Sequence, residues 1–415
     1  MGCAILAGFS PLNSRRRTAM SDAAPKRHPQ TLAVHPEDRI TPGWNAVQIP
    51  VARASTVVFP DLASMRALDW RDDTQWRYGL HATPTSMALA QRLAAIEGGE
   101  HALLHPSGLS SITNVFLAYV RPGDDVLIPD NAYSPTRELA DWYANEWGVS
   151  VRYYDPMIGA GIAAMIESNT KLIWIEAPGS VTMEVSDVPA IARVAREHNV
   201  RTAIDSTYAA GIAFRPLEHG VDIVVQAVTK YQSGGSDVMM GATITRDAEI
   251  QAELKRTRML FGFGVSSDDC ALVLRSLPSM RLRYEAHDRS ALALAEWLAM
   301  RPEIDVVLHP ALPGCPGHDH FVRDFTGAGG LFSVVFKPQY TSAQIDAFVE
   351  GLLYFKLGWS WGGSISLAMP YHVGSMRTAT RWPHEGVLVR FFIGLEEHKD
   401  LRADIEQSLA AHLAA

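Results

Sequence analysis

The sequence predicts an α/β fold, with a mostly parallel seven-stranded sheet covered by helices on both faces and a smaller C-terminal α+β domain. From about residue 100 to residue 275, short apolar runs alternate with longer amphipathic segments, a pattern typical of strands joined by crossover helices. After about residue 275 the strands become fewer and several alternate apolar with polar residues, which is typical of strands with one exposed face. Of the 415 residues, 47% are hydrophobic and 20% are charged, a composition that favours a folded globular chain.

Seven short apolar runs predict the strands of the larger sheet, at residues 102–104, 125–128, 149–153, 171–175, 201–204, 223–225 and 240–244. The longer amphipathic segments between them predict helices at 109–120, 135–147, 159–167, 188–198 and 247–257. Because parallel neighbours need a crossover of about a dozen residues or more, helices in these intervals favour parallel pairing.

The smaller domain is predicted to open with a long helix at 277–301. Three strands at 305–308, 330–336 and 387–392 and two helices at 342–353 and 396–413 follow. We therefore divide the chain into an N-terminal arm (1–75), an α/β domain (76–275) and an α+β domain (276–415). The arm has no long periodic segment, and residues 1–19, which precede Met20, are expected to be disordered.

Composition narrows the class of function. With 37 basic and 45 acidic residues the net charge is −8, which gives no general electrostatic reason to bind nucleic acid or an anionic membrane. No apolar run approaches the roughly 18 residues of a membrane span. The three widely separated cysteines, Cys3, Cys270 and Cys315, argue against a disulfide framework and for a reducing compartment. We expect a cytoplasmic enzyme that acts on a small molecule.

One cluster resembles a metal site, since Cys315, His318 and His320 lie close together in the chain. The cluster lacks the second half that metal-ligand spacings require, and it lies in a stretch rich in proline and glycine. We interpret it as a solvated loop and expect no metal ion.

Chemically useful residues follow three of the predicted strands. Gly108 and Leu109 open a helix whose free N–H groups suit a phosphate, Asp205 follows the strand at 201–204, and Lys230 follows the strand at 223–225. Taken singly, these features also fit a helix cap, a turn carboxylate and a solvated lysine. Ligands of open α/β sheets bind outside the carboxyl ends of the strands, so the three features together favour a shared site.

This combination meets the requirements of pyridoxal phosphate (PLP). The cofactor needs a lysine amine for its aldehyde, a carboxylate that keeps its ring nitrogen protonated, and a cradle for its phosphate. An aromatic side chain over the ring would complete the site, and Tyr133, just after the strand at 125–128, is suitably placed in the sequence.

The chain resembles the Cys/Met-metabolism family of fold-type I PLP-dependent enzymes from about residue 45 to residue 412. Within that family it is most similar to the bacterial cystathionine β-lyases. The matching segments are 97–99, 177–185, 205–211, 226–231, 309–314, 323–327, 360–363 and 390–396. Their shared order along the chain makes chance similarity implausible.

The resemblance implies a role for each matching residue. Lys230 would hold PLP and move protons, and Tyr133 would stack on the ring as a second catalytic residue. The remaining cofactor contacts would come from Asp205, Thr207, Gly108, Leu109, Thr229 and Tyr78. Arg390 would bind the substrate carboxylate in a bidentate pair, beside Ser360 and Trp361. Tyr78 would reach in from a neighbouring subunit, which implies a homotetramer built of dimers with shared active sites.

The implied reaction is β-elimination from cystathionine, which yields homocysteine, pyruvate and ammonia. γ-Acting relatives usually carry glutamate where this chain has Trp359, whereas β-lyases carry an aromatic residue there. Three departures from the family pattern stand out. Leu80 replaces a phosphate-binding arginine, and Ser206 replaces the asparagine of the usual Asp-Asn-Thr motif. Ile365 replaces a glutamate, in a region (364–386) that follows the pattern poorly. The alternatives are another cysteine S-conjugate as substrate, a γ-acting synthase, lyase or sulfhydrylase, and a non-catalytic PLP-binding regulator.

Overall fold

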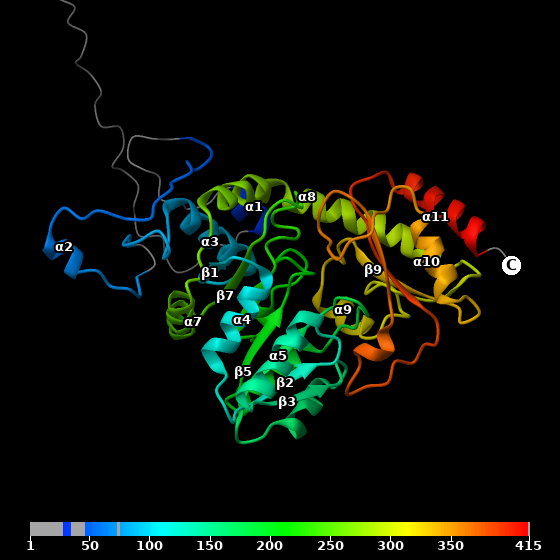
Figure 1. Ribbon diagram of the computed structural model, residues 1–415, viewed down its shortest axis with the longest axis horizontal. Coiled ribbons are helices and arrows are strands. Elements are labelled where there is room, and N and C mark those ends of the chain that lie inside the picture. The colour runs from blue at the N-terminus through cyan, green and yellow to red at the C-terminus, as the bar shows by residue number, and fades with distance from the viewer. Residues whose placement is uncertain (1–27, 35–45, 73–74, 414–415) are drawn as a thin grey trace, which may run out of the picture.

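The computed structural model describes residues 28–34, 46–72 and 75–413, so the prediction for residues 1–19 lies outside the described residues. Two sheets joined by a long helix dominate the structure (Figure 1). The larger sheet has seven strands in the order β1-β7-β6-β5-β4-β2-β3. They are β1 (His101–His105), β2 (Asp125–Pro129), β3 (Ser150–Tyr154), β4 (Thr170–Glu176), β5 (Arg201–Asp205), β6 (Ile223–Gln226) and β7 (Gly241–Thr245).

This sheet is mostly parallel, as predicted. The strands β2 to β6 pair in parallel with one another, and β7 runs antiparallel to both β6 and β1. Every strand lies within one residue of its predicted bounds. The strands are readable in the sequence because both faces of the sheet are covered, so that a strand such as β2 is buried at every position.

Helices cover both faces of the larger sheet. They are α3 (Pro84–Glu97), α4 (Gly108–Tyr119), α5 (Ser134–Trp147), α6 (Val188–Glu197) and α7 (Ala248–Phe261). Successive residues of β4 enter opposite cores: Ile173 packs in the core that contains Leu89 of α3 and Ile191 of α6, whereas Trp174 packs with Phe116 of α4. The period of two along the strand thus assigns alternate side chains to the two helical layers.

The smaller domain is an antiparallel sheet with two helices on its outer face. Its strands, in the order β10-β11-β9-β8, are β8 (Ile304–Leu308), β9 (Leu331–Phe336), β10 (Leu367–Tyr371) and β11 (Leu388–Phe392), and its helices are α10 (Ser342–Glu350) and α11 (His398–His412). Val389 and Phe391 of β11 join the core under these helices, whereas Leu388 and Phe392 join the core of the larger domain. Alternation therefore directs Arg390, between them, toward the larger domain.

The linking helix α8 (Ser267–Leu298) is longer than predicted, because it begins ten residues before position 277. Ser266 caps its first turn by accepting from the N–H of Asp268 at 3.1 Å. Pro278 lies inside the helix, and a proline in that position favours a break when only the sequence is read. The predicted domain boundary at 275/276 falls within α8, and the division into domains stays a prediction.

Other segments also differ from the sequence-based expectations. α3 and β10 were not predicted, and the expected helix at 159–167 is the 3₁₀ helix η1 (Gly159–Met165). α3 is rich in alanine, which gives it little apolar periodicity, although Thr83 and Ser86 form a capping box at its start. The arm contains two short helices, α1 (Pro29–Val34) and α2 (Leu62–Arg66).

The interpretation of residues 315–320 as a solvated loop was wrong. Cys315 is buried and its Sγ donates to the Met183 carbonyl at 3.2 Å, while His320 Nδ1 lies 2.9 Å from the Val185 carbonyl. A short helix, α9 (His318–Asp324), begins within the segment. This segment therefore contacts the loop that joins β4 to α6 of the larger domain.

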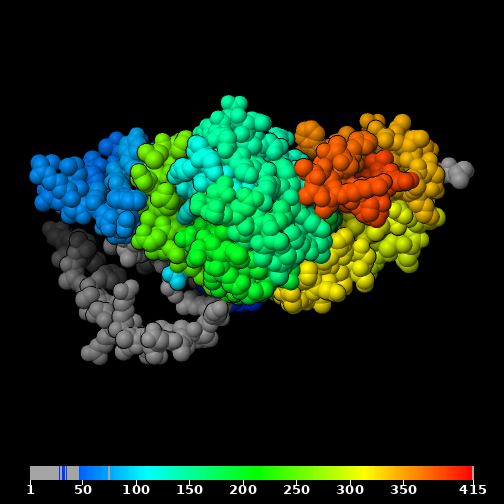
Figure 2. All heavy atoms as spheres, turned by 90° about the horizontal axis from the view of Figure 1, so that it is seen from below, coloured from blue at the N-terminus to red at the C-terminus, as the bar shows by residue number. Residues whose placement is uncertain are grey.

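The arm and the smaller domain occupy opposite ends of the molecule. Seen from below, the arm residues that follow position 45 project at one end, and the smaller domain forms the other (Figure 2). None of the helices in the described ranges is both long enough and apolar enough to cross a lipid bilayer.

Candidate active site

The carboxyl ends of three neighbouring strands bring the predicted residues together. β5 ends at Asp205, and β4 ends at Glu176, the direct register partner of Asp205. β6 ends at Gln226, and the turn after it carries Lys230. This is the edge at which open α/β sheets bind ligands.

Lys230 is largely buried, and its amine faces the smaller domain. Its Nζ lies 2.9 Å from Ser360 Oγ and 5.5 Å from the centroid of the Trp361 ring. Burial and the nearby Arg390 guanidinium lower the pKa of Lys230 to about 8, and Asp205 acts in the opposite direction. A lysine with this pKa is partly unprotonated near neutral pH, so its amine can act as a nucleophile or a base.

Asp205 is one of two adjacent carboxylates at this edge. Burial raises its pKa, and Lys230 counteracts that rise. Glu176 is only 4% exposed, and burial together with the Asp205 carboxylate raises its pKa. Ionisation of two neighbouring buried carboxylates at the same time is unfavourable, because their negative charges repel each other. We therefore expect a proton on one of them, or a cationic group of the ligand beside them.

Both threonines predicted to contact the cofactor are hydrogen-bonded within the protein. Thr207 Oγ1 donates to Asp205 Oδ1 at 2.6 Å and accepts from the Ala227 N–H at 2.9 Å. Thr229 Oγ1 donates to the Met240 carbonyl at 3.1 Å and accepts from the Met240 N–H at 2.9 Å. Thr207 thus orients the carboxylate, and Thr229 ties the lysine turn to the start of β7.

The start of α4 lies against the turn that carries the lysine. Ser107 caps the helix by accepting from the Ser110 N–H at 3.0 Å, which leaves the N–H groups of Gly108 and Leu109 without an intrahelical partner. A Cβ on Gly108 would lie 2.8 Å from the Ala227 side chain. Only glycine therefore allows this helix start to approach the backbone three residues before Lys230.

Arg390 reaches the same site from the smaller domain. It is 8% exposed, it donates from Nη1 to the Ser180 carbonyl at 3.0 Å, and its guanidinium lies 5.1 Å from the centroid of the Tyr371 ring. Burial lowers its pKa. Among the described residues no carboxylate pairs with it, and a buried cation of this kind suits an anionic ligand.

Tyr133 stands at the start of α5, on the same side of the sheet edge. Its backbone N–H donates to Glu176 Oε2 at 2.8 Å, and its ring is 43% exposed. Burial raises the pKa of Tyr133, and the carboxylates of Asp205 and Glu176 add to that rise while Arg390 opposes it. The pKa of the phenol is therefore sensitive both to the carboxylate pair and to the arginine.

Tyr78 is not brought into this group within one chain. It forms an isolated bridge with Thr56 and an edge contact with His81, and its side chain is 46% exposed. The Leu80 carbonyl accepts a hydrogen bond from Arg258 Nη1 at 3.1 Å. Within the described residues, no hydrogen bond or ring contact joins Tyr78 to Lys230, Asp205 or Tyr133.

The residues present fit PLP. A largely buried lysine can react with an aldehyde, and both described hydrogen bonds to Asp205 end on Oδ1, which leaves Oδ2 for a protonated ring nitrogen. The α4 start offers two N–H groups to a phosphate. Tyr133 offers an exposed ring face, and Arg390 offers a buried cation to an amino-acid carboxylate.

An α/β sheet with a lysine, a carboxylate and a helix start at its carboxyl edge defines a PLP-dependent enzyme. The model of the family described as "Cys/Met metabolism PLP-dependent enzyme" matches residues 30–410. The chain belongs to this family, and PLP is its cofactor.

Individual relatives agree with the family model over most of their lengths. The chain is 37% identical to cystathionine β-lyase MetC of Escherichia coli, over 88% of this chain and 94% of that protein. It is 39% identical to a cystathionine β-lyase of Bordetella avium, over 94% and 99% respectively. The solved structure of cystathionine γ-synthase from Xanthomonas oryzae pv. oryzae, in complex with aminoacrylate and cysteine, superposes with a TM-score of 0.84 at 28% identity, over 93% and 99%.

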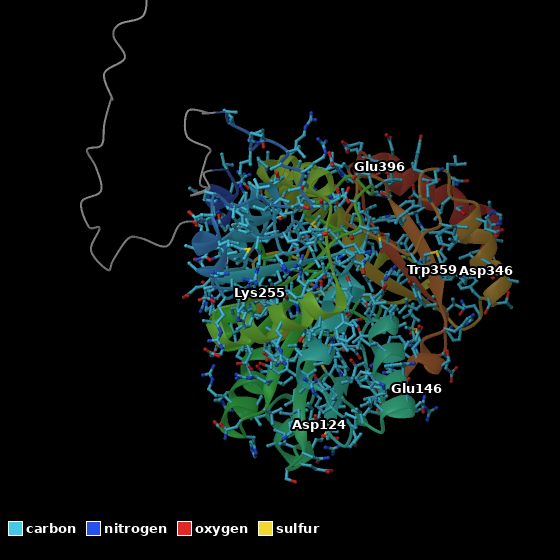
Figure 3. The ribbon with its side chains drawn as sticks, turned by 60° about the vertical axis from the view of Figure 1, so that its left-hand side comes forward. Asp124, Glu146, Lys255, Asp346, Trp359 and Glu396 are labelled. Carbon is cyan, nitrogen blue, oxygen red and sulfur yellow. The ribbon has the colours of Figure 1, made fainter. Side chains whose placement is uncertain are left out.

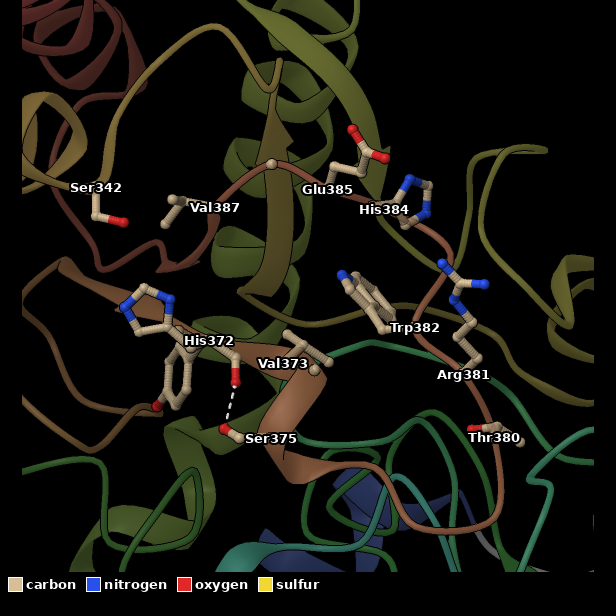
Figure 4. Close-up of a pocket in the computed structure, with 13 residues that line it drawn as sticks. Ser342, His372, Val373, Ser375, Thr380, Arg381, Trp382, His384, Glu385 and Val387 are labelled. Carbon is tan, nitrogen blue, oxygen red and sulfur yellow. Dashed lines mark hydrogen bonds between the residues drawn. The ribbon is translucent and has the colours of Figure 1, made fainter.

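A hollow of about 630 Å³ lies on the smaller domain (Figure 4). It is lined mostly by residues 371–387, and Tyr371, whose ring contacts Arg390, is one of them. His372, Arg381 and Glu385 stand around it, and Ser375 Oγ donates to the His372 carbonyl at 3.0 Å. Lys230 and Arg390 are not among the residues that line the hollow.

Two residues of this site were not identified from the sequence. Glu176 ends a strand that was predicted, and the rule that strand ends carry the site could have found it. Tyr371 lies on β10, a strand that the sequence did not reveal. In the described residues no group of three or more histidine, cysteine, aspartate or glutamate side chains is arranged to hold a metal ion.

Proposed function

We propose that this protein is a carbon–sulfur β-lyase that cleaves cystathionine, with water, into homocysteine, pyruvate and ammonia. The observation that carries the proposal is the meeting of Lys230 and Arg390 at one site, where a base and a carboxylate-binding cation lie at the junction of the two domains. Relatives that match over nearly their whole length bear the name cystathionine β-lyase.

In this proposal, residues of the larger domain hold the cofactor. Lys230 would hold the cofactor through its aldehyde, Asp205 would keep a proton on the ring nitrogen, and Tyr133 would cover the ring. Gly108 and Leu109 donate their N–H groups to the phosphate, with the Thr229 and Thr207 hydroxyls bracing the surrounding turns. When bound, PLP supplies an electron-accepting ring that stabilises negative charge on the substrate Cα.

The protein then orients the substrate and moves its protons. Arg390 binds the α-carboxylate, and Ser360 and Trp361 flank the amine of Lys230. Lys230, with its amine unprotonated, would take the proton from Cα and deliver a proton to the departing sulfur as the Cβ–S bond breaks. The enamine product is hydrolysed by water to pyruvate and ammonia.

β-Elimination is favoured over γ-chemistry by Trp359. The side chain is 81% exposed at the edge of the smaller domain, where Figure 3 labels it. A carboxylate at this position, as in γ-acting relatives, could act on a substrate amine or proton, and tryptophan cannot. Ile365 is also exposed, and an apolar side chain here is compatible with other cysteine S-conjugates as substrates.

The same proposal includes assembly and location. The exposed Tyr78 supports a homotetramer built of dimers, in which each site is completed by a neighbouring copy. The charge balance and the free thiols of Cys270 and Cys315 support a cytoplasmic location.

A substrate panel tests the activity. Purified protein with PLP is assayed for pyruvate and for 2-oxobutanoate on cystathionine, homocysteine and S-alkylcysteines. We expect pyruvate with cystathionine as the best substrate. Pyruvate only from other S-conjugates would support the second substrate class, and 2-oxobutanoate in its place would support a γ-acting enzyme. A protein that gains no visible absorption band with PLP, or whose band borohydride does not abolish, would contradict the proposal.

A further inference from the structure

Glu176 is a buried carboxylate that the proposed mechanism does not use. It ends β4 in register with Asp205, yet its own hydrogen bonds go to backbone groups of two other segments. Oε2 accepts from the Tyr133 N–H at 2.8 Å, and Oε1 accepts from the Ser180 N–H at 3.0 Å. One side chain therefore joins the start of α5 to the loop that follows β4.

The loop end of this bridge leads directly to Arg390. The Ser180 carbonyl accepts from Arg390 Nη1 at 3.0 Å, so the N–H and the carbonyl of one residue contact Glu176 and the arginine respectively. A continuous path of hydrogen bonds thus runs from Tyr133 through Glu176 and Ser180 to Arg390. The path connects the larger domain to the smaller one.

The two bridged segments are also pressed together. A Cβ on Gly179 would lie 2.5 Å from Asn131 Nδ2 and 2.8 Å from Asn131 Cβ. The loop can follow its course only with glycine at this position. Because the two segments are closely packed, Tyr133 and Ser180 have little room to move independently. The Glu176 side chain fixes their positions relative to each other along the direction of β4.

We propose that Glu176 is a positioning residue, which holds the ring of Tyr133 and the guanidinium of Arg390 in a fixed relation through its hydrogen bonds to the Tyr133 and Ser180 backbones. The inference rests on the proposed roles of Tyr133 and Arg390. Glu176 contacts neither substrate nor cofactor in this scheme, and it acts on both through the residues that it fixes.

The experiment compares binding of glycine to wild-type holoprotein with binding to Glu176→Gln and Glu176→Ala. Glycine carries the α-amine and α-carboxylate but no leaving group, so visible absorbance reports binding without any turnover. Affinity for PLP is measured in parallel on cofactor-free protein. Glu97→Gln is the matched control, because Glu97 is also a buried glutamate whose pKa is raised to about 8, and its bond partner is Gln226.

Glutamine has one acceptor oxygen for the two N–H donors, so one donor is left unsatisfied in Glu176→Gln. We expect this variant to weaken the binding of either glycine or PLP about tenfold, the usual cost of an unsatisfied buried donor. Glu176→Ala leaves both donors unsatisfied and should weaken the binding of both. In the Arg390→Lys background, Glu176→Ala should weaken glycine binding less than it does in the wild type, because the path to Arg390 is already changed. The control should keep wild-type affinities.

Each result decides between the alternatives. Wild-type affinities in folded Glu176→Ala, with only a lower melting temperature, would overturn the positioning role and leave a stabilising one. Should Glu176→Ala fail to fold, unchanged affinities in Glu176→Gln would overturn it equally. A wild-type holoprotein that does not respond to glycine would instead contradict the proposed site itself, and with it this inference.

Discussion

Lys230 is the residue on which most of the local charges act. Burial and Arg390 favour its neutral amine, and Asp205 favours the ammonium. The resulting pKa of about 8 is well below the ordinary lysine value of 10.5. A neutral amine is what the first contact with the cofactor aldehyde requires, because the ammonium has no electron pair to donate.

We therefore predict that covalent capture of PLP by the cofactor-free protein accelerates as the pH rises, with a midpoint near 8. Below this pH the amine is protonated and capture is slow, and above it the rate levels off. Asp205→Asn removes the group that raises this pKa, so its midpoint should move to lower pH. The measurement is the rate of the visible absorbance change between pH 6 and pH 10. A rate that still rises at pH 10 without levelling off would show that burial has no such effect on the pKa of Lys230.

Arg390 is the second residue with a specific expected effect. Arg390→Lys keeps the positive charge but loses the planar fork that pairs with a carboxylate. Losing one charge-assisted hydrogen bond costs about 1.5–3 kcal/mol, so KM should rise about 10- to 100-fold with a smaller change in kcat. Arg323→Lys, an exposed arginine paired with Asp187 and Asp324, is the matched control. Equal steady-state constants for the two variants would contradict the carboxylate role.

At the scale of elements, the segment after residue 359 depends on an anchor at the end of β11. Glu396 accepts from the N–H of Ser366 at 2.8 Å and from its hydroxyl at 2.8 Å, and the Gly394 N–H donates to the same hydroxyl. Figure 3 labels Glu396 at the start of the C-terminal region that leads into α11. These bonds hold the chain that presents Ser360 and Trp361 to the lysine.

We predict that Glu396→Ala lowers kcat about tenfold while PLP still binds, because the loss of two hydrogen bonds loosens the segment without touching the cofactor contacts. Glu397→Ala is the control, since Glu397 is exposed and its ion pair is with the adjacent His398. Cofactor content is read from visible absorbance and kcat from pyruvate release. A wild-type rate in Glu396→Ala would mean that packing alone holds the segment.

At the scale of the whole molecule, the site lies where two independently ordered sheets meet. The inward face of β11 delivers Arg390, and the carboxyl edge of the larger sheet delivers Lys230 and Asp205. Tyr78 belongs to the segment that leads from the arm at the opposite end of the molecule. A complete site, as proposed, thus needs both domains of one copy and a segment of another.

Subunit mixing tests that arrangement. Tyr78→Ala and Lys230→Ala should each have little activity, because each lacks one part of every site. The two variants are mixed, denatured and refolded together. Each hybrid dimer would then contain one intact site, and random pairing would restore about one quarter of the wild-type activity. Each variant refolded alone is the control. Activity that stays at the level of the separate variants would contradict shared sites.

The strand pattern of the larger domain and its chemically important residues were predictable from the sequence. Strands buried on both faces are short continuous apolar runs, and residues directly after them, such as Asp205, Gly108 and Lys230, lie at one edge by the geometry of parallel strands. The start of α8, the strand β10 and the helix α3 were not predictable in this way. Their positions depend on a cap, on a pairing with β11 and on packing against the larger core.

The sequence by itself determined the class of fold, the family and the chemistry, because these depend on periodicity and on residue types at fixed places along the chain. Only the tertiary structure decided how the side chains act on one another. Arg390 lowers the pKa of Lys230 from 160 residues away, and Glu176 bonds to Tyr133 across 43 residues. Such effects depend on burial and distance in space, and separation along the chain carries neither quantity.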